Sequence, residues 1–438
     1  MIRVIELKKA EPEVIESIKR RAQADIDEVR GSVMEIIAAV RRDGDDALVR
    51  YTRQWDDDAF DRKNLRVSES DFDEAYRETP ASTIEKIKDQ IQLSRRFHQL
   101  QRKHIVDWQE ETEPGILVGE KWTPMDRVGL YVPGGKNPFP TVQQILAVPA
   151  KIAGCPSIVS CVSPRGKNYE VLIAARESGV EELFRVSGPH AIAAMAYGTE
   201  SIKPVELVAG PGNPFVTAAK ILCQDRIAID MPAGPSEAII LAEGSVRGEG
   251  VTLQRLAAFC AADVLARAEH GPDSAGVLVT ESAELAALTK SEIERQTKTL
   301  SRQHYIHEAL ERYSAIVVTE SLEESIAFTN EYAPEHLELL SPRPEMILDR
   351  IHNAGSVFLG YFNPVAAGDY ASGVNHILPT GTWARRSSAV AVWTFMKRVQ
   401  YSNLTAAGLK RLQPIVQTIA DVEGLDAHRR SVDIRFEE

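Results

Sequence analysis

The chain has few of the features that mark secreted, membrane or nucleic-acid-binding proteins. Among its 438 residues are four scattered cysteines and no CxxC pair, which excludes a disulfide scaffold and a thiolate zinc ribbon and suits a reducing compartment. No stretch approaches the roughly 20 apolar residues that span a bilayer, and the N-terminal sequence lacks the apolar core of a signal peptide. Basic residues are outnumbered by acidic ones, 51 to 63, which argues against a nucleic-acid phosphate binder. We therefore expect a cytoplasmic protein that binds neither membranes nor nucleic acid.

The pattern of apolar residues favours an α/β protein with more than one domain. Hydrophobic residues make up 44% of the chain, which is typical of a globular protein. Apolar residues at helical spacing predict helices over the first hundred residues, including a long one at 82–103. From Arg127 onward, short apolar runs alternate with helical stretches, and the alternation resumes after Ser236, which predicts two layers of parallel sheet and helix. From about Trp393 the pattern is again that of helices.

Several turns carry glycine and proline where a ligand could approach the backbone. An intact GxGxxG is absent, but Gly210-Pro211-Gly212-Asn213 follows a predicted strand and precedes a predicted helix, which is half of a dinucleotide-binding fingerprint. A plain strand-to-helix turn explains this spacing equally well. Ser236 lies in a similar turn, MPAGPSE, where it either caps an element or contacts a ligand.

Histidines with neighbouring carboxylates are the candidates for catalysis. Two adjacent pairs, Glu269-His270 and Glu335-His336, occur at predicted element ends, where both side chains can reach one site. A histidine beside a carboxylate can act as a general base near neutral pH, although a lone surface pair is the commoner case. The glycine-rich segment GDYASGVNHILPTG and the C-terminal EGLDAH add further polar side chains. Nitrogen and oxygen ligands suited to zinc are present but scattered: His270, Asp369 and His428.

A series of motifs in this order resembles the histidinol dehydrogenase family. The motifs run from residue 129 to residue 428: GLYVPGG, PAKIAG, AIAAMAYGTESI, VAGPGN, IDMPAGPSE, AEHGPDS, APEHLEL, GSVFLG, GDYASGVNHILPTG and EGLDAH. The resemblance implies oxidation of L-histidinol to L-histidine by two NAD-dependent hydride transfers through an enzyme-held aldehyde. It also implies a homodimer whose C-terminal domain reaches the neighbour's active site, and a role in histidine biosynthesis.

The resemblance also implies an architecture of two Rossmann-like α/β domains, each an incomplete dinucleotide-binding unit, with small helical N- and C-terminal domains. Residues 129–236 would form the NAD-binding α/β domain, and 386–438 the C-terminal domain that reaches the partner. The other α/β domain, which would carry most catalytic residues, combines 25–128 with 237–385. Residues 1–24 would be an N-terminal helical extension.

The same resemblance implies roles for individual residues. His336 would be the general base of both oxidations, and Glu335 would activate the water that hydrates the aldehyde. Zinc would be held by His270, Asp369 and, from the partner chain, His428. The expected substrate contacts are Ser236, His270, His336, Asp369, His376, Glu423 and His428. NAD would contact Tyr131 and Asn213.

Two residues and one segment depart from the family pattern; the segment KNPFPTVQQILAVP replaces a serine-rich stretch that lies near the substrate in the family. Arg267 stands where the family has a glutamine that ligates zinc, and a guanidinium has no acceptor with which to bind a metal. Either Arg267 pairs with Asp263 one turn away and zinc keeps three protein ligands, or zinc is weakened or lost and Arg267 pairs with Asp369 or with an anionic group of the substrate. His190 replaces a glutamine near NAD, where both residue types can donate a hydrogen bond.

These departures keep other functions open. One alternative retains the fold, NAD and the catalytic pair but oxidises a different primary alcohol, such as an anionic sulfonated diol. A zinc hydrolase is a second alternative, disfavoured because no HExxH motif occurs. A non-catalytic binding homologue is the third, and retention of the acidic and imidazole side chains of the motifs argues against it.

Overall fold

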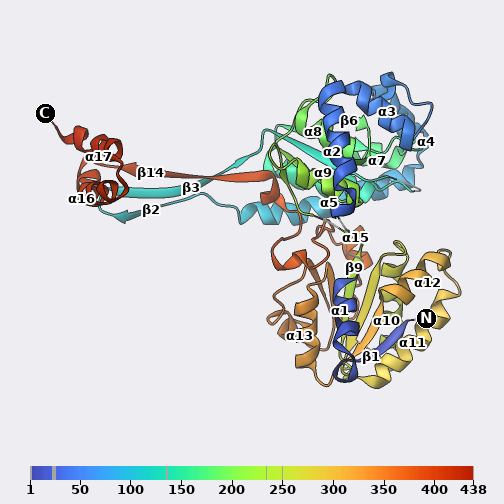
Figure 1. Cartoon of the computed structure of the whole chain (residues 1–438). Coiled ribbons are helices and arrows are strands. Elements are labelled where there is room, and N and C mark those ends of the chain that lie inside the picture. Colours follow the sequence, from blue (N-terminus) through green and yellow to red (C-terminus); the bar gives the residue numbers. More distant parts are fainter. Residues whose placement is uncertain (1, 22–25, 135–136, 233, 249, 438) are drawn as a thin grey trace.

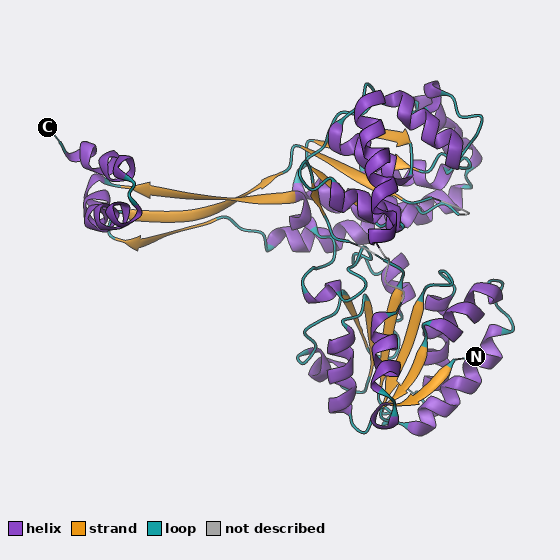
Figure 2. Cartoon of the chain, in the orientation of Figure 1, coloured by secondary structure: helices purple, strands orange, loops and turns teal. Residues whose placement is uncertain are grey.

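The molecule consists of two α/β bodies and a long arm (Figures 1 and 2). The computed structural model describes residues 2–21, 26–134, 137–232, 234–248 and 250–437. Each body is built on one parallel sheet, so the α/β fold class predicted from the sequence is confirmed. None of the helices within the described ranges is both long and apolar enough to cross a membrane.

The first body is a six-stranded parallel sheet covered by helices on both faces. Its strands, in order across the sheet, are β1 (Arg3–Glu6), β11 (Ala315–Val318), β10 (Ala275–Thr280), β9 (Glu237–Ala242), β12 (His336–Leu340) and β13 (Ser356–Leu359). Alternate side chains point to opposite faces: Ile240 joins the cluster under one set of helices and Ile239 the cluster under the other. One face carries α10 (Leu253–Ala268), α11 (Ala283–Thr297) and α12 (Gln303–Arg312). The other carries α1 (Pro12–Arg20), α13 (Leu322–Tyr332) and α14 (Pro344–Leu348).

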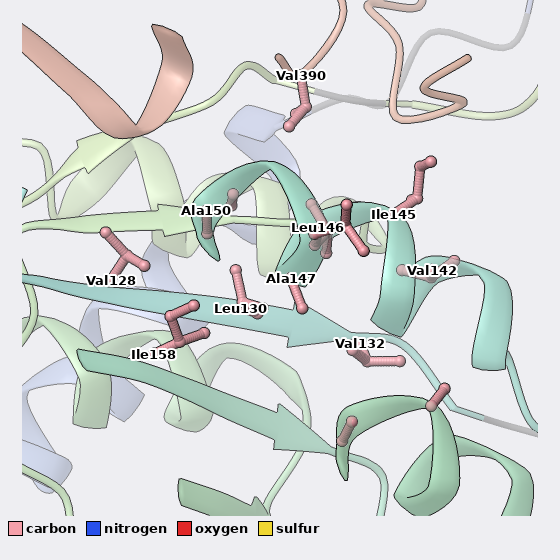
Figure 3. Packing of buried hydrophobic residues seen from close by; sticks show 14 of the residues in the cluster. Val128, Leu130, Val132, Val142, Ile145, Leu146, Ala147, Ala150, Ile158 and Val390 are labelled. Carbon is pink, nitrogen blue, oxygen red and sulfur yellow. The ribbon is translucent and has the colours of Figure 1, made fainter. Parts of the chain in front are cut away.

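The second body is a five-stranded parallel sheet with four helices on each face. Its strands, in order, are β6 (Glu182–Arg185), β5 (Ser157–Val162), β4 (Arg127–Val132), β7 (Leu207–Ala209) and β8 (Ala228–Ile229). Figure 3 shows α6 side chains such as Leu146 packed over Leu130 of β4 and Ile158 of β5. On that face lie α4 (Glu69–Glu78), α5 (Ala81–Lys103), α6 (Pro140–Ala153) and α7 (Tyr169–Ser178). On the other lie α2 (Ile26–Asp43), α3 (Asp45–Trp55), α8 (Gly188–Tyr197) and α9 (Pro214–Leu222).

The helices before residue 104 pack differently from the sequence-based prediction. We expected residues 25–128 to join residues 237–385, but α2 to α5 cover the five-stranded sheet instead. Val33 of α2 is buried with β5 residues, and Ile87 of α5 is buried with β4 residues. Residues 1–24 were expected to form a separate helical extension, of which Met1 and residues 22–25 lie outside the described residues. Within it, β1 pairs with β11 at the edge of the six-stranded sheet.

The arm is a three-stranded antiparallel ribbon that ends in two helices. It pairs β14 (Met396–Leu404) with β3 (Ile116–Pro124), and β3 with β2 (Trp108–Glu113). At its far end lie α16 (Ala406–Glu423) and α17 (Asp426–Asp433), with the C-terminus beyond them (Figure 1). The prediction of helix from about Trp393 is wrong for β14. Its side chains between Met396 and Leu404 are exposed on both faces, so no apolar alternation marks the strand in the sequence.

The site region lies between the two bodies. Helix α15 (Val365–Tyr370) and the start of β9 are on the side of the six-stranded body that faces the other body (Figure 1). Strands β9 and β12 both begin at this edge, because Ala238 pairs with His336 in register. Side chains at the amino ends of these two strands are therefore neighbours.

Candidate active site

His336 is held at the start of β12 by groups on both of its ring nitrogens. Its Nδ1 lies 3.1 Å from the backbone carbonyl of Glu237 and 3.3 Å from a carboxylate oxygen of Glu335. Its Nε2 lies 3.5 Å from Oδ1 of Asp369. Burial and nearby Arg267 oppose the charged imidazolium, but the two carboxylates outweigh them and raise the pKa of His336 above its ordinary value. The ring is thus fixed in orientation and tuned as a base.

Glu335 is oriented by the neighbouring strand. Its Oε2 accepts a hydrogen bond of 2.8 Å from the backbone N–H of Glu237, and its side chain is 9% exposed. Adjacent residues in a strand point to opposite faces, but Glu335 precedes the first residue of β12. Both side chains of the Glu335-His336 pair therefore reach one site.

Arg267 enters the same site from the C-terminal end of α10. Its side chain is 4% exposed, and Nη2 lies 3.4 Å from Oδ2 of Asp369. Of the two alternatives for Arg267, the pairing with Asp369 is therefore the one that forms. The carboxyl group of Asp263 instead hydrogen-bonds to that of Glu338, and burial together with Asp263 raises the pKa of Glu338 well above its ordinary value. Asp369 is thus bridged between a guanidinium and an imidazole, and burial is outweighed by these cations, which lower its pKa.

The side chains at this site do not fit a zinc ion. Arg267 holds an oxygen of Asp369 that a metal would need, and it brings a permanent positive charge to the position. Among the residues that the structure describes, no three His, Cys, Asp or Glu side chains are grouped so as to hold a metal. His270 follows α10 and is exposed, and His428 lies on the arm. The predicted ligand set is therefore not assembled within one chain.

Four buried polar atoms at the site lack a hydrogen-bond partner among the described residues. They are Nε of Arg267, Nδ1 of His376, and the facing atoms Nε2 of His336 and Oδ1 of Asp369, whose 3.5 Å contact is an ion pair without a hydrogen bond. Buried polar groups are nearly always satisfied, so four such atoms in one place indicate where a polar ligand binds. Two of these atoms, Nε of Arg267 and Oδ1 of Asp369, belong to charged groups, and hydrogen bonds from charged groups to a ligand are stronger than those between neutral groups.

His376 and Ser236 border this group. Burial lowers the pKa of His376 to about 4, so its imidazole is neutral at neutral pH. The next residue back in its loop, Asn375, is anchored by a 3.0 Å hydrogen bond to the carbonyl of Ile145. Ser236 directly precedes β9, and its carbonyl accepts a 3.0 Å hydrogen bond from the N–H of Ala275. The Asn375 side chain thus anchors the loop that carries His376, and a backbone bond fixes Ser236 next to β9.

Two predicted site residues are not brought to this place by their own chain. Glu423 ends α16 and His428 lies in α17, and both are exposed. These helices stand at the far end of the arm, away from α15 (Figure 1). A single chain therefore leaves both residues unused at its own site.

The carboxyl ends of the five-stranded sheet form a second candidate region for ligand binding. Ligands of parallel α/β sheets bind at this edge. Tyr131 of β4 is buried there, and its hydroxyl accepts a 3.0 Å hydrogen bond from the N–H of Gly188. Gly210 has φ of +136°, and a Cβ at this position would lie 2.0 Å from the Tyr131 carbonyl, so only glycine fits. Gly135 and Lys136 of the loop after β4 lie outside the described residues.

The turn after β7 is fixed by a buried lysine. Nζ of Lys220 donates hydrogen bonds of 2.9 Å to the carbonyls of Gly210 and Met231 and also pairs with Asp230. The Asp230 carboxylate accepts a 2.8 Å bond from the N–H of Gly210. Asn213 uses its side chain to cap α9, with Oδ1 accepting from the N–H of Val216 at 3.1 Å. The turn is therefore rigid before any ligand binds.

His190 is fully buried. Its ring lies 5.6 Å from the ring of Tyr51 and 5.7 Å from that of Trp55. Burial lowers its pKa to about 3, so the imidazole is neutral. Neither ring nitrogen has a hydrogen-bond partner among the described residues.

Sequence reasoning assigned no role to Glu237, which contacts both Glu335 and His336, or to Arg21, which contacts Glu237. Glu237 opens an otherwise apolar buried strand, and a fully buried carboxylate is rare unless it is paired, so its position was a signal. Arg21 is its partner. It lies 216 residues away in the chain, and nothing in the local sequence connects the two.

Comparisons with known proteins cover nearly the whole chain. A family model described as histidinol dehydrogenase matches residues 19–436. Histidinol dehydrogenase of Methanothermobacter thermautotrophicus is 41% identical over 420 residues, 95% of this chain and 96% of that protein. The Geobacter sulfurreducens enzyme is 43% identical, over 93% of this chain and 94% of its own. The crystal structure of histidinol dehydrogenase from Elizabethkingia anophelis has a TM-score of 0.91 and 33% identity, covering 99% of this chain and 98% of that one.

Proposed function

The chain belongs to the histidinol dehydrogenase family, and from this premise we propose that it oxidises L-histidinol to L-histidine in two steps through an enzyme-held aldehyde. As a member of this family it is an NAD-dependent oxidoreductase. The observation that carries the proposal is the buried imidazole of His336, which is held between the carboxylates of Glu335 and Asp369 and whose Nε2 has no hydrogen-bond partner among the described residues. In the overall reaction, one alcohol, two NAD⁺ and one water give one carboxylate, two NADH and three protons.

The first oxidation needs a base for the hydroxyl proton. An alcohol carbon releases hydride only as its O–H proton leaves, so the base must be within hydrogen-bond reach. Nδ1 of His336 donates to the Glu237 carbonyl, which leaves Nε2 as the atom that accepts the proton. Asp369, 3.5 Å away, stabilises the imidazolium that forms. NAD⁺, when bound, would accept the hydride of both oxidations.

The second oxidation needs water. An aldehyde becomes oxidisable by hydride loss when water adds to its carbonyl carbon. Glu335 accepts the proton of that water at its carboxylate, and the bond from the Glu237 N–H keeps the carboxylate in place. His336 then removes the proton of the hydrate, so one base serves both oxidations. The carboxylate leaves as product.

The NAD site is assigned to the carboxyl ends of the five-stranded sheet. The conformation that only glycine allows at Gly210 brings the backbone close to any group bound there. Tyr131 and Asn213 border this turn and are the proposed NAD contacts. The His190 ring packs against Gly188, whose N–H donates to the Tyr131 hydroxyl, and so supports the proposed NAD site.

For the metal, we propose that Arg267 replaces zinc as the fixed cation of the site. The ion pair with Asp369 supports this assignment, and no step of the reaction is routed through zinc. The free Nε–H of Arg267 is a donor for an oxygen of the substrate. His270 remains a polar neighbour at the mouth of the site.

A second copy of the chain would complete the site. The arm exposes apolar side chains at its end: Ile415, Ile419 and Val422 are 61%, 50% and 79% exposed. Exposed apolar faces of this kind mark protein interfaces. We propose a homodimer in which the arm packs against the other copy and delivers Glu423 and His428 to its site. The four cysteines, all buried free thiols, suit the cytoplasm as the compartment.

Product stoichiometry tests the reaction. Limiting L-histidinol with excess NAD⁺ should give two NADH and histidine. His336→Gln should lose both oxidations, typically by 10²–10⁴-fold for a general base, whereas Glu335→Gln should slow the second more than the first. One NADH per substrate with free aldehyde accumulating would contradict the proposal, as would faster turnover of a different primary alcohol.

A further inference from the structure

Arg21 lies buried at the end of α1, in contact with the body that holds the catalytic pair. Its side chain is 3% exposed and that of Glu237 is 2% exposed. The guanidinium donates hydrogen bonds to the Glu237 carboxylate from both Nε and Nη2, and Nη2 lies 2.6 Å from Oε1. This two-pronged geometry fixes the carboxylate in direction as well as in place.

Glu237 in turn contacts both members of the catalytic pair. Its N–H donates to Oε2 of Glu335 at 2.8 Å, and its carbonyl lies 3.1 Å from Nδ1 of His336. Its side-chain Oε1 accepts from the N–H of Glu335 and from the N–H of Gly381, each at 3.2 Å. A shift of Glu237 therefore moves the carboxylate and the imidazole together.

Arg21 also holds the turn that leads into the pair. Its Nη1 donates to the carbonyl of Tyr332 at 2.9 Å, and its Nη2 approaches the carbonyl of Ala333 at 3.4 Å. These carbonyls end helix α13 and have no helical partner. Ala333 is left-handed, with φ of +51°, and the guanidinium stacks 3.7 Å above the ring of Tyr332. One side chain thus fixes the turn from which Glu335 and His336 project.

We propose that Arg21 is a positioning residue for the reaction: through Glu237 and the turn at Tyr332 and Ala333, it holds Glu335 and His336 in reactive orientation. The N-terminal helix is then part of the active-site support. This inference rests on the proposed function, because it assigns the chemistry to these two residues. Burial and the neighbouring Glu335 raise the pKa of Glu237 even beside Arg21, so loss of Arg21 would favour a neutral carboxyl that holds the turn less firmly.

The test compares Arg21→Met and Arg21→Lys with wild type in the full-length enzyme. Arg21→Met should lower kcat for histidinol about 10- to 100-fold, since small misplacements of catalytic groups cost this much, and leave KM for NAD⁺ unchanged. Arg21→Lys keeps the charge but not the two hydrogen bonds to the Glu237 carboxylate. Its kcat should lie between those of wild type and Arg21→Met. Histidinol deuterated at the reacting carbon should show a larger isotope effect on kcat in Arg21→Met, because chemistry becomes slower than product release.

Lys19→Met is the matched control. Lys19 lies on the same helix and pairs with Glu331 at 2.5 Å near the end of α13, but it does not touch the catalytic pair. It should keep wild-type kcat and isotope effect. If Arg21→Met folds poorly, the double variant Arg21→Met, Glu237→Gln removes both buried charges and should regain thermal stability while kcat stays low.

Each result has a defined meaning. Arg21→Met with wild-type kcat and isotope effect would overturn the positioning role while leaving the reaction intact. A fall in activity that only matches the loss of folded protein would overturn it too. Wild-type enzyme that does not oxidise histidinol would instead refute the proposed function on which the inference depends.

Discussion

At the scale of single residues, Arg267 shows how one side chain can change the chemistry of a site. Its backbone position on α10 is that of a residue facing the site, and its length lets the guanidinium reach Asp369 across 3.4 Å. A neutral amide at this position would offer a carbonyl oxygen to a metal, whereas a guanidinium offers only donors. The same helix thus builds either a metal ligand or an internal cation.

Exchange of this residue should therefore change the metal content. We expect wild-type protein to bind little zinc and Arg267→Gln to bind about one zinc per chain, because Asp369 is released and the repelling charge is gone. Elemental analysis after dialysis against zinc, and zinc titration calorimetry, measure this. Arg255→Gln, on the exposed face of the same helix, is the control. Stoichiometric zinc in wild type, lost together with activity on chelation, would refute the assignment.

At the scale of elements, the sequence predicts a strand or helix best where buried apolar residues recur at the regular spacing of that element. Strand β9 and helix α10 are apolar enough to be predicted from the sequence, and the Glu335-His336 pair was correctly placed at an element end. The ion pair between Arg21 and Glu237 was not predicted, because it joins residues 216 positions apart. Strand β14 was missed since its two faces are both exposed.

The pairing of β12 with α10 predicts a pH-dependent stability. Glu338 of β12 faces Asp263 of α10, and its carboxyl accepts a 2.6 Å bond from the N–H of Val365. Burial and Asp263 raise the pKa of Glu338, so the folded state prefers the protonated acid. The stabilising contribution of the protonated Glu338 carboxyl is complete below the pKa that this group has in the unfolded chain. It is lost as pH rises through the pKa that the group has in the folded protein.

Replacement by an uncharged amide should remove this loss. Compared with wild type, Glu338→Gln should gain stability as pH rises from 5 to 9, by about 1–2 kcal/mol at the upper end, the scale of one buried polar group. Urea unfolding at several pH values measures the difference. Glu284→Gln, exposed on α11, should follow the wild-type curve. Parallel curves for Glu338→Gln and wild type would show that the acid pair does not share a proton.

At the scale of the whole molecule, the sequence predicted two parallel α/β units but not how the helices divide between them. Helices α2 to α5 have apolar stripes that fit either sheet, and only packing against β4 and β5 assigns them to the second body. The arm extends from the second body. The chain leaves the second body through β2, returns through β3 and leaves again through β14, so the helices after β14 stand far from their own chain's site (Figure 1).

A shared site makes a prediction about mixed dimers. In the proposed homodimer each chain would supply His336 to its own site and Glu423 to its neighbour's, so His336→Gln and Glu423→Ala homodimers should both be nearly inactive. When the two variants are expressed together, half of the dimers are mixed and each has one intact site. About one quarter of the wild-type activity should then return, as expected for a two-fold assembly. Coexpression of two differently tagged His336→Gln chains is the control and should stay inactive. If activity does not recover in purified mixed dimers, or if Glu423→Ala alone is fully active, the site lies within a single chain.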